Sequence, residues 1–147
     1  MPNLAENRKA WHDYTILDAY EAGIVLSGQE VKSVKLGQIS LKGSFVHFKN
    51  GEAFLVNAHI SPYAKAKTDP AYKPERDRKL LLGKKQLIQI ADRRFSEGLT
   101  VVPLSVYTKG AFVKIKIALA RGKRKYDKRI AIKNKEIAKK IKRMVNR

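Results

Sequence analysis

Hydrophobic and polar side chains alternate most clearly between residues 111 and 120. One set of alternate positions is apolar and consists of Val113, Ile115, Ile117 and Leu119. The alternation predicts a strand with one face in the core, while the other, basic face carries Phe112, Lys114, Lys116 and Ala118. A second strand is predicted at 99–107, and the short turn between the two contains a glycine.

The strongest turn signal is the pair Asn50 and Gly51, because Asn followed by Gly supplies the positive φ angles of a type I′ turn. The flanking stretches 45–49 and 52–58 therefore predict the two strands of a β-hairpin. A short apolar segment at 39–41 precedes the hairpin.

Residues 14–26 predict another strand, since the segment is rich in β-branched and aromatic side chains. It is interrupted around Glu21, Ala22 and Gly23. A glycine inside a strand indicates either a bulge or the close approach of another backbone. Glu21 is an acid in a basic protein, so it either pairs with a nearby Lys or Arg or accepts hydrogen bonds from a base edge or a sugar. The residues alone leave both alternatives open.

Two helices are predicted between the strands. Ser27 and Glu30 match a capping box, in which the serine caps the helix and the glutamate three residues later bonds back to it, and Gly37 ends the helix. A second helix is predicted over 83–96, with Gly98 after its end. Its core face is expected to consist of Leu87, Ile88, Ala91 and Phe95.

The order of these elements predicts a mainly β fold for residues 1–120. About six strands in consecutive pairs favour an antiparallel sheet that closes into a small barrel, because closure removes exposed edges. Residues 3–14 are expected to form a short docked arm. Residues 59–79 are expected to form a long basic loop, since they contain three prolines and interleaved Lys, Arg and Tyr residues.

Positive charge is concentrated at the C-terminal end of the chain, and it indicates a segment that differs from the predicted barrel. The chain has 147 residues and a net charge of +19, and residues 121–147 contain 13 Lys or Arg and two acidic residues, a net of +11. This density predicts an extended tail that binds nucleic acid, without distinguishing RNA from DNA. From Ile130 the spacing predicts an amphipathic basic helix with Asp127 as its N-cap. The alternatives are a solvated helix packed on the barrel and a membrane-surface helix.

The sequence contains no pattern typical of an enzyme, a metal site or a cofactor site. Cysteine is absent, and the three histidines, His12, His47 and His59, lack the spacing of metal ligands. No phosphate-binding loop or nucleophile motif occurs. No apolar stretch has the length of a signal-peptide core or a membrane span, so a cytoplasmic protein is expected.

Four separated motifs stand out: YEAGIVLSGQEVKSVK at 20–35, GEAFLVNAHISP at 51–62, RKLLL at 78–82 and IALARGKRKYDKR at 117–129. Together they resemble the SmpB family of tmRNA-binding proteins. The resemblance covers nearly the whole chain. It implies an OB-type (oligonucleotide-binding) antiparallel β-barrel with flanking helices, and a basic tail at 121–147 that is disordered when free and helical on the ribosome.

The resemblance also implies a function in ribosome rescue. Family members bind the tRNA-like domain of tmRNA, deliver it to ribosomes stalled on messages without a stop codon, and so allow the nascent chain to be tagged for degradation. The implied partners are tmRNA, the ribosome through its small-subunit rRNA, and elongation factor Tu indirectly through aminoacylated tmRNA. Neither DNA nor a membrane is expected as a partner.

Residue by residue, the resemblance places two groups of RNA contacts. On the barrel, the positions that match tmRNA-binding residues are Glu21, Leu81, Tyr14 and Asn7. In the tail, the positions expected at the decoding centre and in the empty mRNA channel are Gly122, Lys123, Arg124, Tyr126, Asp127, Lys128 and Arg129. Gly122 matches a hinge glycine. Tyr126 stands where some members have histidine, and its ring keeps a face for stacking on a base.

Two other classes of protein would also combine a basic charge with a small β-barrel. A general ribosomal or RNA-chaperone protein of the OB type would bind many structured RNAs about equally, so competition with bulk tRNA distinguishes it. A DNA-compacting protein would prefer duplex DNA with a steep salt dependence and no selectivity among RNAs.

Overall fold

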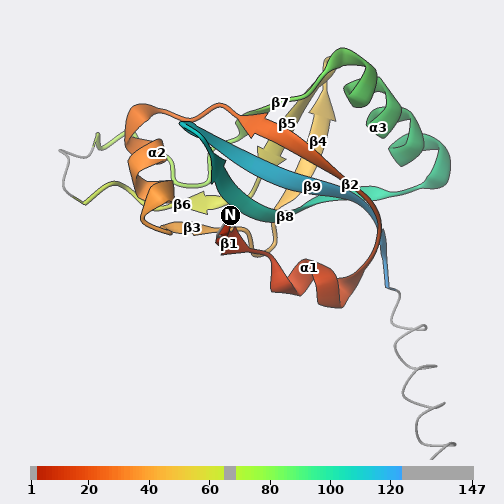
Figure 1. Cartoon of the computed structure of the whole chain (residues 1–147), viewed down its shortest axis with the longest axis horizontal. Helices are drawn as coiled ribbons and strands as arrows, with labels where there is room; N and C mark the ends of the chain where they lie inside the picture. The colour runs from red at the N-terminus through yellow and green to blue at the C-terminus, as the bar shows by residue number, and fades with distance from the viewer. Residues whose placement is uncertain (1–2, 65–68, 124–147) are drawn as a thin grey trace, which may run out of the picture.

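The computed structural model describes residues 3–64 and 69–123, which form a closed antiparallel β-barrel with flanking helices (Figure 1). The barrel strands are β2 (Tyr14–Ile24), β4 (Phe45–Lys49), β5 (Glu52–Val56), β7 (Arg78–Leu81), β8 (Thr100–Lys109) and β9 (Phe112–Gly122). They pair in the order β8-β4-β5-β7-β2-β9, and β8 also pairs with β9, so the sheet closes. The predicted OB-type barrel of six strands is confirmed.

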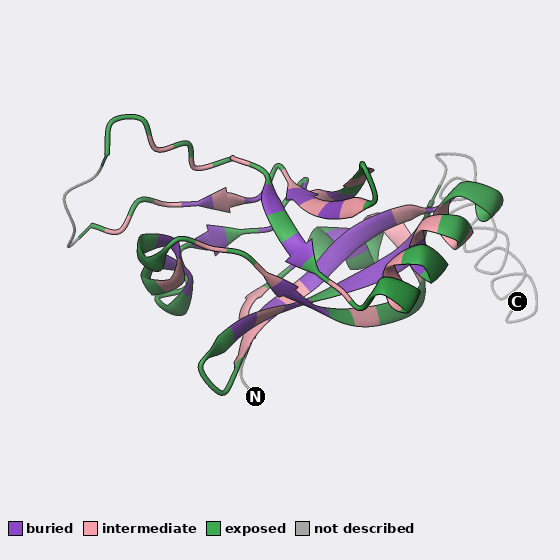
Figure 2. Ribbon diagram, turned by 90° about the horizontal axis from the view of Figure 1, so that it is seen from above, coloured by how far each residue is buried: buried purple, intermediate pink, exposed green. Residues whose placement is uncertain are grey.

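Inward-facing side chains from all six barrel strands form the core. The predicted core face of β9 is confirmed, because Ile115, Ile117 and Leu119 are fully buried. The buried residues that the other five strands contribute to this cluster include Ala22, Val46, Leu55, Leu80 and Val101. Figure 2 shows buried residues concentrated along the strands, whereas the helices and loops are largely exposed.

Three helices of the described residues lie outside the barrel: α1 (Arg8–Asp13), α2 (Gly28–Lys35) and α3 (Lys84–Glu97). In Figure 1, α2 lies at one end of the molecule beside a small sheet, and α3 lies at the other. That small sheet pairs β3 (Ile39–Ser40) with β6 (His59–Ile60). No helix within 3–64 or 69–123 is long and apolar enough to cross a membrane.

Local signals in the sequence located the turns and caps correctly. Asn50 and Gly51 have φ angles of 52° and 74°, as the predicted hairpin turn requires. The capping box of α2 is also present. Ser27 Oγ accepts a hydrogen bond from Glu30 N at 3.2 Å, and Ser27 N donates to Glu30 Oε1 at 3.0 Å.

The N-terminal segment is more regular than the docked arm predicted from the sequence. β1 (Asn3–Glu6) pairs with β8, and α1 follows it. Ala10 of α1 belongs to a second apolar cluster, whose other buried members are Val102, Leu104, Ala118 and Ala120. The outward face of β9 is therefore basic only as far as Lys116. A four-residue strand and a six-residue helix are too short to show a hydrophobic period, so the pattern missed them.

Strand β2 is confirmed, but its irregularity is not where the sequence placed it. The register shift lies between Ile16 and Asp18, and Glu21 to Gly23 pair regularly with β9. Gly23 is needed for a close approach instead of a bulge. A Cβ atom on Gly23 would lie 3.2 Å from Leu81 Cβ on the neighbouring strand, closer than side chains normally pack.

Helix α3 has the predicted bounds within a residue, but its predicted core face is confirmed only in part, since Leu87 packs against the core. Ile90 is fully buried, whereas Ile88 and Phe95, both predicted in the core, are 51% and 87% exposed. The guanidinium of Arg94 lies 5.7 Å from the ring centre of Phe48 on the barrel. Because arginine has a long apolar stem and its charge is attracted to an aromatic face, it takes the place that the apolar spacing assigned to Phe95.

Segment 59–79, predicted as a long basic loop, begins with β6 and ends in β7, and some of its basic side chains are bound inside the protein. Arg78, at the start of β7, is fully buried, and its Nη2 donates to Glu30 Oε2 at 2.6 Å. Arg76 donates to the same carboxylate, which is itself only 1% exposed. Two arginines of the predicted basic loop therefore join it to α2.

Candidate nucleic-acid interface

Two of the predicted RNA contacts, Glu21 and Leu81, lie close together on the outside of the barrel. Leu81 of β7 is paired in register with Gly23 of β2, two residues after Glu21. Residues two apart along a strand point to the same side, so Glu21 and the position covered by Leu81 share one face. The missing side chain at Gly23 lets Leu81 lie across β2 while 53% of its surface stays exposed.

Glu21 is held as a charged acceptor on this face. Tyr107 Oη donates to Glu21 Oε2 at 2.5 Å, and Lys109 Nζ lies 3.4 Å from Glu21 Oε1. The bond from Tyr107 is the main reason that the pKa of Glu21 is lowered, and Lys109 adds to the effect. Burial, together with the carboxylate, raises the pKa of Tyr107 to about 12. Of the two alternatives that the sequence left open for Glu21, the pairing with a lysine is therefore present. The contact of Glu21 with RNA stays a prediction.

Replacing Tyr107 by phenylalanine is expected to raise the pKa of Glu21 toward its ordinary value of 4.5, because the largest lowering contribution is lost. A carboxyl carbon NMR titration of the variant measures this shift. Tyr63→Phe is the matched control, since the ring of Tyr63 contacts Lys32 and not Glu21. An unchanged titration of Glu21 in the Tyr107 variant would contradict the assigned hydrogen bond.

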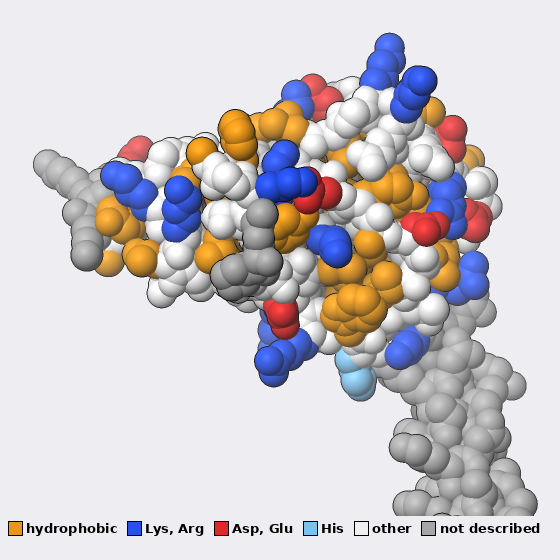
Figure 3. Space-filling model, viewed as in Figure 1, with side chains coloured by type: hydrophobic (Ala, Val, Ile, Leu, Met, Phe, Trp, Pro, Cys, Tyr) orange, Lys and Arg blue, Asp and Glu red, His pale blue; other side chains and the backbone are white. Residues whose placement is uncertain are grey.

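Lysines and apolar side chains surround this pair. Phe112 is 70% exposed, and Lys114 Nζ lies 5.9 Å from the centre of its ring. Together with Leu81, these two residues line a shallow groove of about 290 Å³. Figure 3 shows, on one face of the molecule, apolar groups interspersed with Lys, Arg and carboxylate side chains. Aromatic and apolar surface between lysines suits unstacked bases and their phosphates.

The other two predicted barrel contacts, Asn7 and Tyr14, lie at the opposite end of β2. Seven residues separate Tyr14 from Glu21, about 23 Å at the usual rise of a strand. Asn7 is 5% exposed, and its side chain is used inside the protein. Its Oδ1 caps α1 by accepting from Ala10 N at 3.2 Å, while its Nδ2 donates to Pro103 O at 2.9 Å. The four predicted residues thus fall into two separate areas.

Asn7→Ala is expected to lower the free energy of unfolding by about 1–3 kcal/mol, because a helix cap is lost and a buried carbonyl loses its donor. Urea unfolding measures the change. Asn3→Ala is a suitable control, since in the described structure the side chain of Asn3 bonds only to exposed Glu6, at 2.8 Å. An Asn7 variant as stable as the unaltered protein would contradict this structural role.

The beginning of the predicted tail belongs to the barrel. Gly122 is the last residue of β9 and is paired with Tyr14, and Lys123 N donates to Asp13 O at 2.9 Å. The regular structure therefore passes residue 120 and reaches Lys123. The remaining predicted contacts and the predicted helix lie outside the described residues; the contacts are Arg124, Tyr126, Asp127, Lys128 and Arg129.

The three histidines lie on different elements, α1, β4 and β6. His12 pairs with Asp13 and His59 with Glu75, while His47 is exposed on β4. Over the described part of the chain, no group of three His, Cys, Asp or Glu side chains could hold a metal ion.

Comparison with known proteins identifies the family. The model of the SmpB protein family matches residues 4–147. The chain belongs to the SmpB family. SmpB relatives include an SsrA-binding protein of Enterococcus faecalis, 49% identical over 95% of this chain and 90% of its own length. Another, from Sulfurihydrogenibium sp., is 50% identical over 94% of this chain and 90% of its own length.

A solved SmpB structure supports the same assignment. It is described as "tmRNA-SmpB: a journey to the center of the bacterial ribosome" and matches with a TM-score of 0.69 and 44% identity. The match covers 87% of this chain and 93% of the solved chain.

Proposed function

We propose that this SmpB family member binds the tRNA-like domain of tmRNA and delivers it to stalled ribosomes for trans-translation. The observation that carries the proposal is the near full-length similarity to SsrA-binding proteins and to a chain solved with tmRNA. The protein acts by binding, not by catalysis, in the cytoplasm. Its other partners are small-subunit rRNA and, through aminoacylated tmRNA, elongation factor Tu.

The structure supports separate roles for the barrel and the tail, a division of labour in which the barrel binds tmRNA and the tail binds the empty mRNA channel. The face with Glu21 and Leu81 offers a fixed carboxylate acceptor and apolar surface between lysines, which suits the shape and displayed bases of a folded RNA. The tail from Arg124 onward carries dense positive charge. A channel filled by mRNA would exclude such a segment, whereas an empty channel lined with phosphates would bind and order it.

Two variants test this division. Leu81→Ala is expected to weaken tmRNA binding about tenfold, as loss of a central apolar contact does, without affecting the tail. Deleting residues 124–147 leaves every described element intact and is expected to keep tmRNA affinity within a few-fold while abolishing tagging on stalled ribosomes. Affinity is measured by filter binding in excess bulk tRNA, and tagging in a reconstituted translation system.

Leu36→Ala is the control for the barrel variant, since Leu36 is an exposed leucine, 63% accessible, after α2. The proposal is wrong if the full-length protein binds tmRNA no better than bulk tRNA. The division of labour is wrong if the deletion abolishes tmRNA binding or leaves tagging intact.

A further inference from the structure

Trp11, the only tryptophan in the sequence, lies on α1 with 57% of its surface exposed. Tryptophan is on average among the highly buried residues, so this exposure is unusual. Helix α1 packs on the barrel through Ala10, its one buried residue, which belongs to the second apolar cluster. The packing of α1 therefore does not account for Trp11, and an exposed aromatic ring is surface that a partner can cover.

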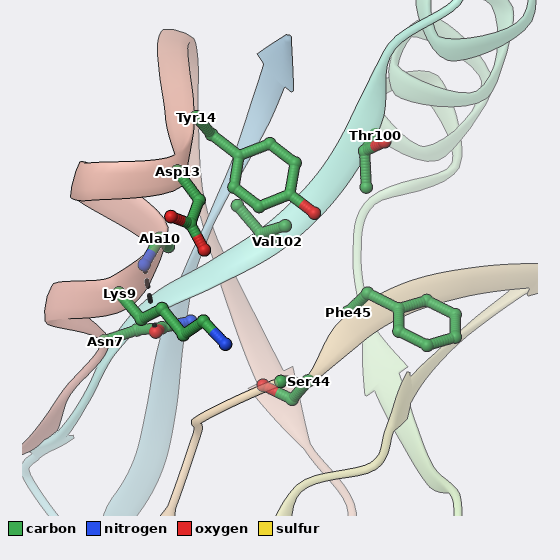
Figure 4. A pocket seen from close by; sticks show the side chains of 10 residues that line it. Asn7, Lys9, Ala10, Asp13, Tyr14, Ser44, Phe45, Thr100 and Val102 are labelled. Atoms are coloured by element: carbon green, nitrogen blue, oxygen red, sulfur yellow. Dashed lines mark hydrogen bonds between the residues drawn. The ribbon is translucent and has the colours of Figure 1, made fainter. Parts of the chain in front are cut away.

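The two sides of α1 face different surroundings. On one side, Lys9 and Asp13 line a pocket of about 310 Å³ between α1, β8 and the segment that leads into β4 (Figure 4). Successive helical residues are rotated by about 100°, so Trp11 and His12 lie on the other side, and Arg8 lies one turn before them. All three of these side chains are exposed. They form a surface, here called the Trp11 surface, that faces away from the pocket.

The Trp11 surface is close to the point where the basic tail leaves the barrel. Lys123 N donates to the backbone oxygen of Asp13, the second residue after Trp11, at 2.9 Å. Residues 121–147 carry a net charge of +11. Within the described part of the chain, Arg8 forms no ion pair. A polyanion that binds the tail therefore comes within reach of Arg8 and Trp11 as well.

We propose that Trp11 stacks on an unpaired base of the RNA that binds the basic tail, and that Arg8 binds a phosphate beside that base. An aromatic ring among cations is the usual composition of a site for single-stranded RNA, because the ring stacks on a base and the cations bind the backbone. Charge complementarity favours RNA over a protein partner, since protein interfaces are depleted in lysine and the tail that follows is rich in it.

The inference rests on the proposed function for the identity of the RNA, which is small-subunit rRNA. The Trp11 surface lies at the end of β2 that begins with Tyr14, opposite the end with Glu21. It is therefore separate from the face formed by Glu21 and Leu81. Because tmRNA contacts are also predicted for Asn7 and Tyr14, tmRNA is the other source of a base at this end of the barrel, and binding to each RNA has to be measured separately.

The fluorescence of Trp11 reports the stack directly, because the sequence has no other tryptophan. Oligouridylate, an RNA without stable base pairing, is titrated into the full-length protein and is expected to quench the emission, since a stacked base quenches indole fluorescence. The matched control combines Trp11→Phe with Phe95→Trp, which moves the single tryptophan to an 87% exposed position on α3. Its emission is expected to be quenched much less. Equal quenching in the two proteins, or none in the unaltered protein, would overturn the proposal.

The source of the base is tested with purified small ribosomal subunits and with tmRNA. Trp11→Ala is expected to weaken binding to the subunits at least about fivefold, the lower limit for loss of a base–aromatic stack, and to leave tmRNA affinity unchanged. Trp11→Phe keeps an aromatic face and is expected to lose less. Phe95→Ala, which removes an exposed ring from α3, is the control and is expected to lose nothing. Co-sedimentation measures binding to the subunits, and filter binding measures binding to tmRNA.

The outcomes separate this inference from the proposed function. Full affinity of Trp11→Ala for the subunits, or a loss of tmRNA affinity instead, contradicts only this inference. A loss of subunit affinity without quenching by oligouridylate would identify a protein contact and would also overturn the inference. A protein that binds tmRNA no better than bulk tRNA contradicts only the proposed function, because neither oligouridylate nor the subunits contain tmRNA.

Discussion

Glu30→Ala is expected to lower the free energy of unfolding by about 3–5 kcal/mol, the usual result of removing one partner from a buried ion pair. The carboxylate of Glu30 is 1% exposed and Arg78 is fully buried, so the variant leaves a guanidinium in the core without its counter-charge. It also removes half of the capping box of α2. Thermal and urea unfolding measure the loss.

Glu52→Ala is the matched control. Glu52 pairs with Lys79 at 3.1 Å, but both side chains are nearly half exposed. Exposed pairs contribute at most about 1 kcal/mol, so this variant is expected to be close to the unaltered protein in stability. If the two glutamate variants lost similar stability, the buried carboxylate would not be what holds segment 59–79 to α2.

The same carboxylate is expected to make stability fall in acid. Burial alone would raise the pKa of Glu30, but the bonds from Arg76, Ser27 N and Arg78 lower it from 4.5 to about 2. As pH falls, the unfolded chain therefore takes up this proton before the folded chain does. The contribution is complete above pH 4.5 and is lost between pH 4.5 and about 2, roughly 3 kcal/mol in all.

Comparison with Glu30→Gln isolates this contribution from that of other acids. The stability difference between the two proteins is expected to be largest near pH 6 and to shrink steadily below pH 4.5. Urea unfolding at a series of pH values measures it. Curves that stay parallel down to pH 2.5 would contradict the lowered pKa.

The sequence predicted the barrel well because its evidence was local and periodic. Alternation in β9 and the Asn50–Gly51 turn each depend on residues close together in the chain, and both are confirmed. The sequence also identified the capping role of Glu30. It could not show that two arginines more than 40 residues away bond to the same carboxylate, because charge density alone does not distinguish a buried arginine from a phosphate-binding one.

At the candidate site, too, the sequence could not predict contacts between residues that are distant in the chain. Glu21 and Leu81 were proposed from a resemblance to family motifs, and only the pairing of β2 with β7 shows that they share a face. Tyr107 has no motif, so its bond to Glu21 was missed. The internal role of Asn7 was missed as well, because its partner Pro103 is distant in the chain. In α3, the apolar spacing placed Phe95 in the core, whereas Phe95 is exposed and Arg94 contacts Phe48 of the barrel.

The pairing of β2 with β9 has a mechanical consequence. The ladder runs from Tyr14 opposite Gly122 to Gly23 opposite Lys114, a span of about 30 Å within a closed barrel. Glu21 lies near one end of this span, and the chain leaves the described structure at the other. The ladder therefore keeps the distance and orientation between its two ends constant. A partner that binds the Glu21 end thereby fixes the position at which the described structure ends, Lys123.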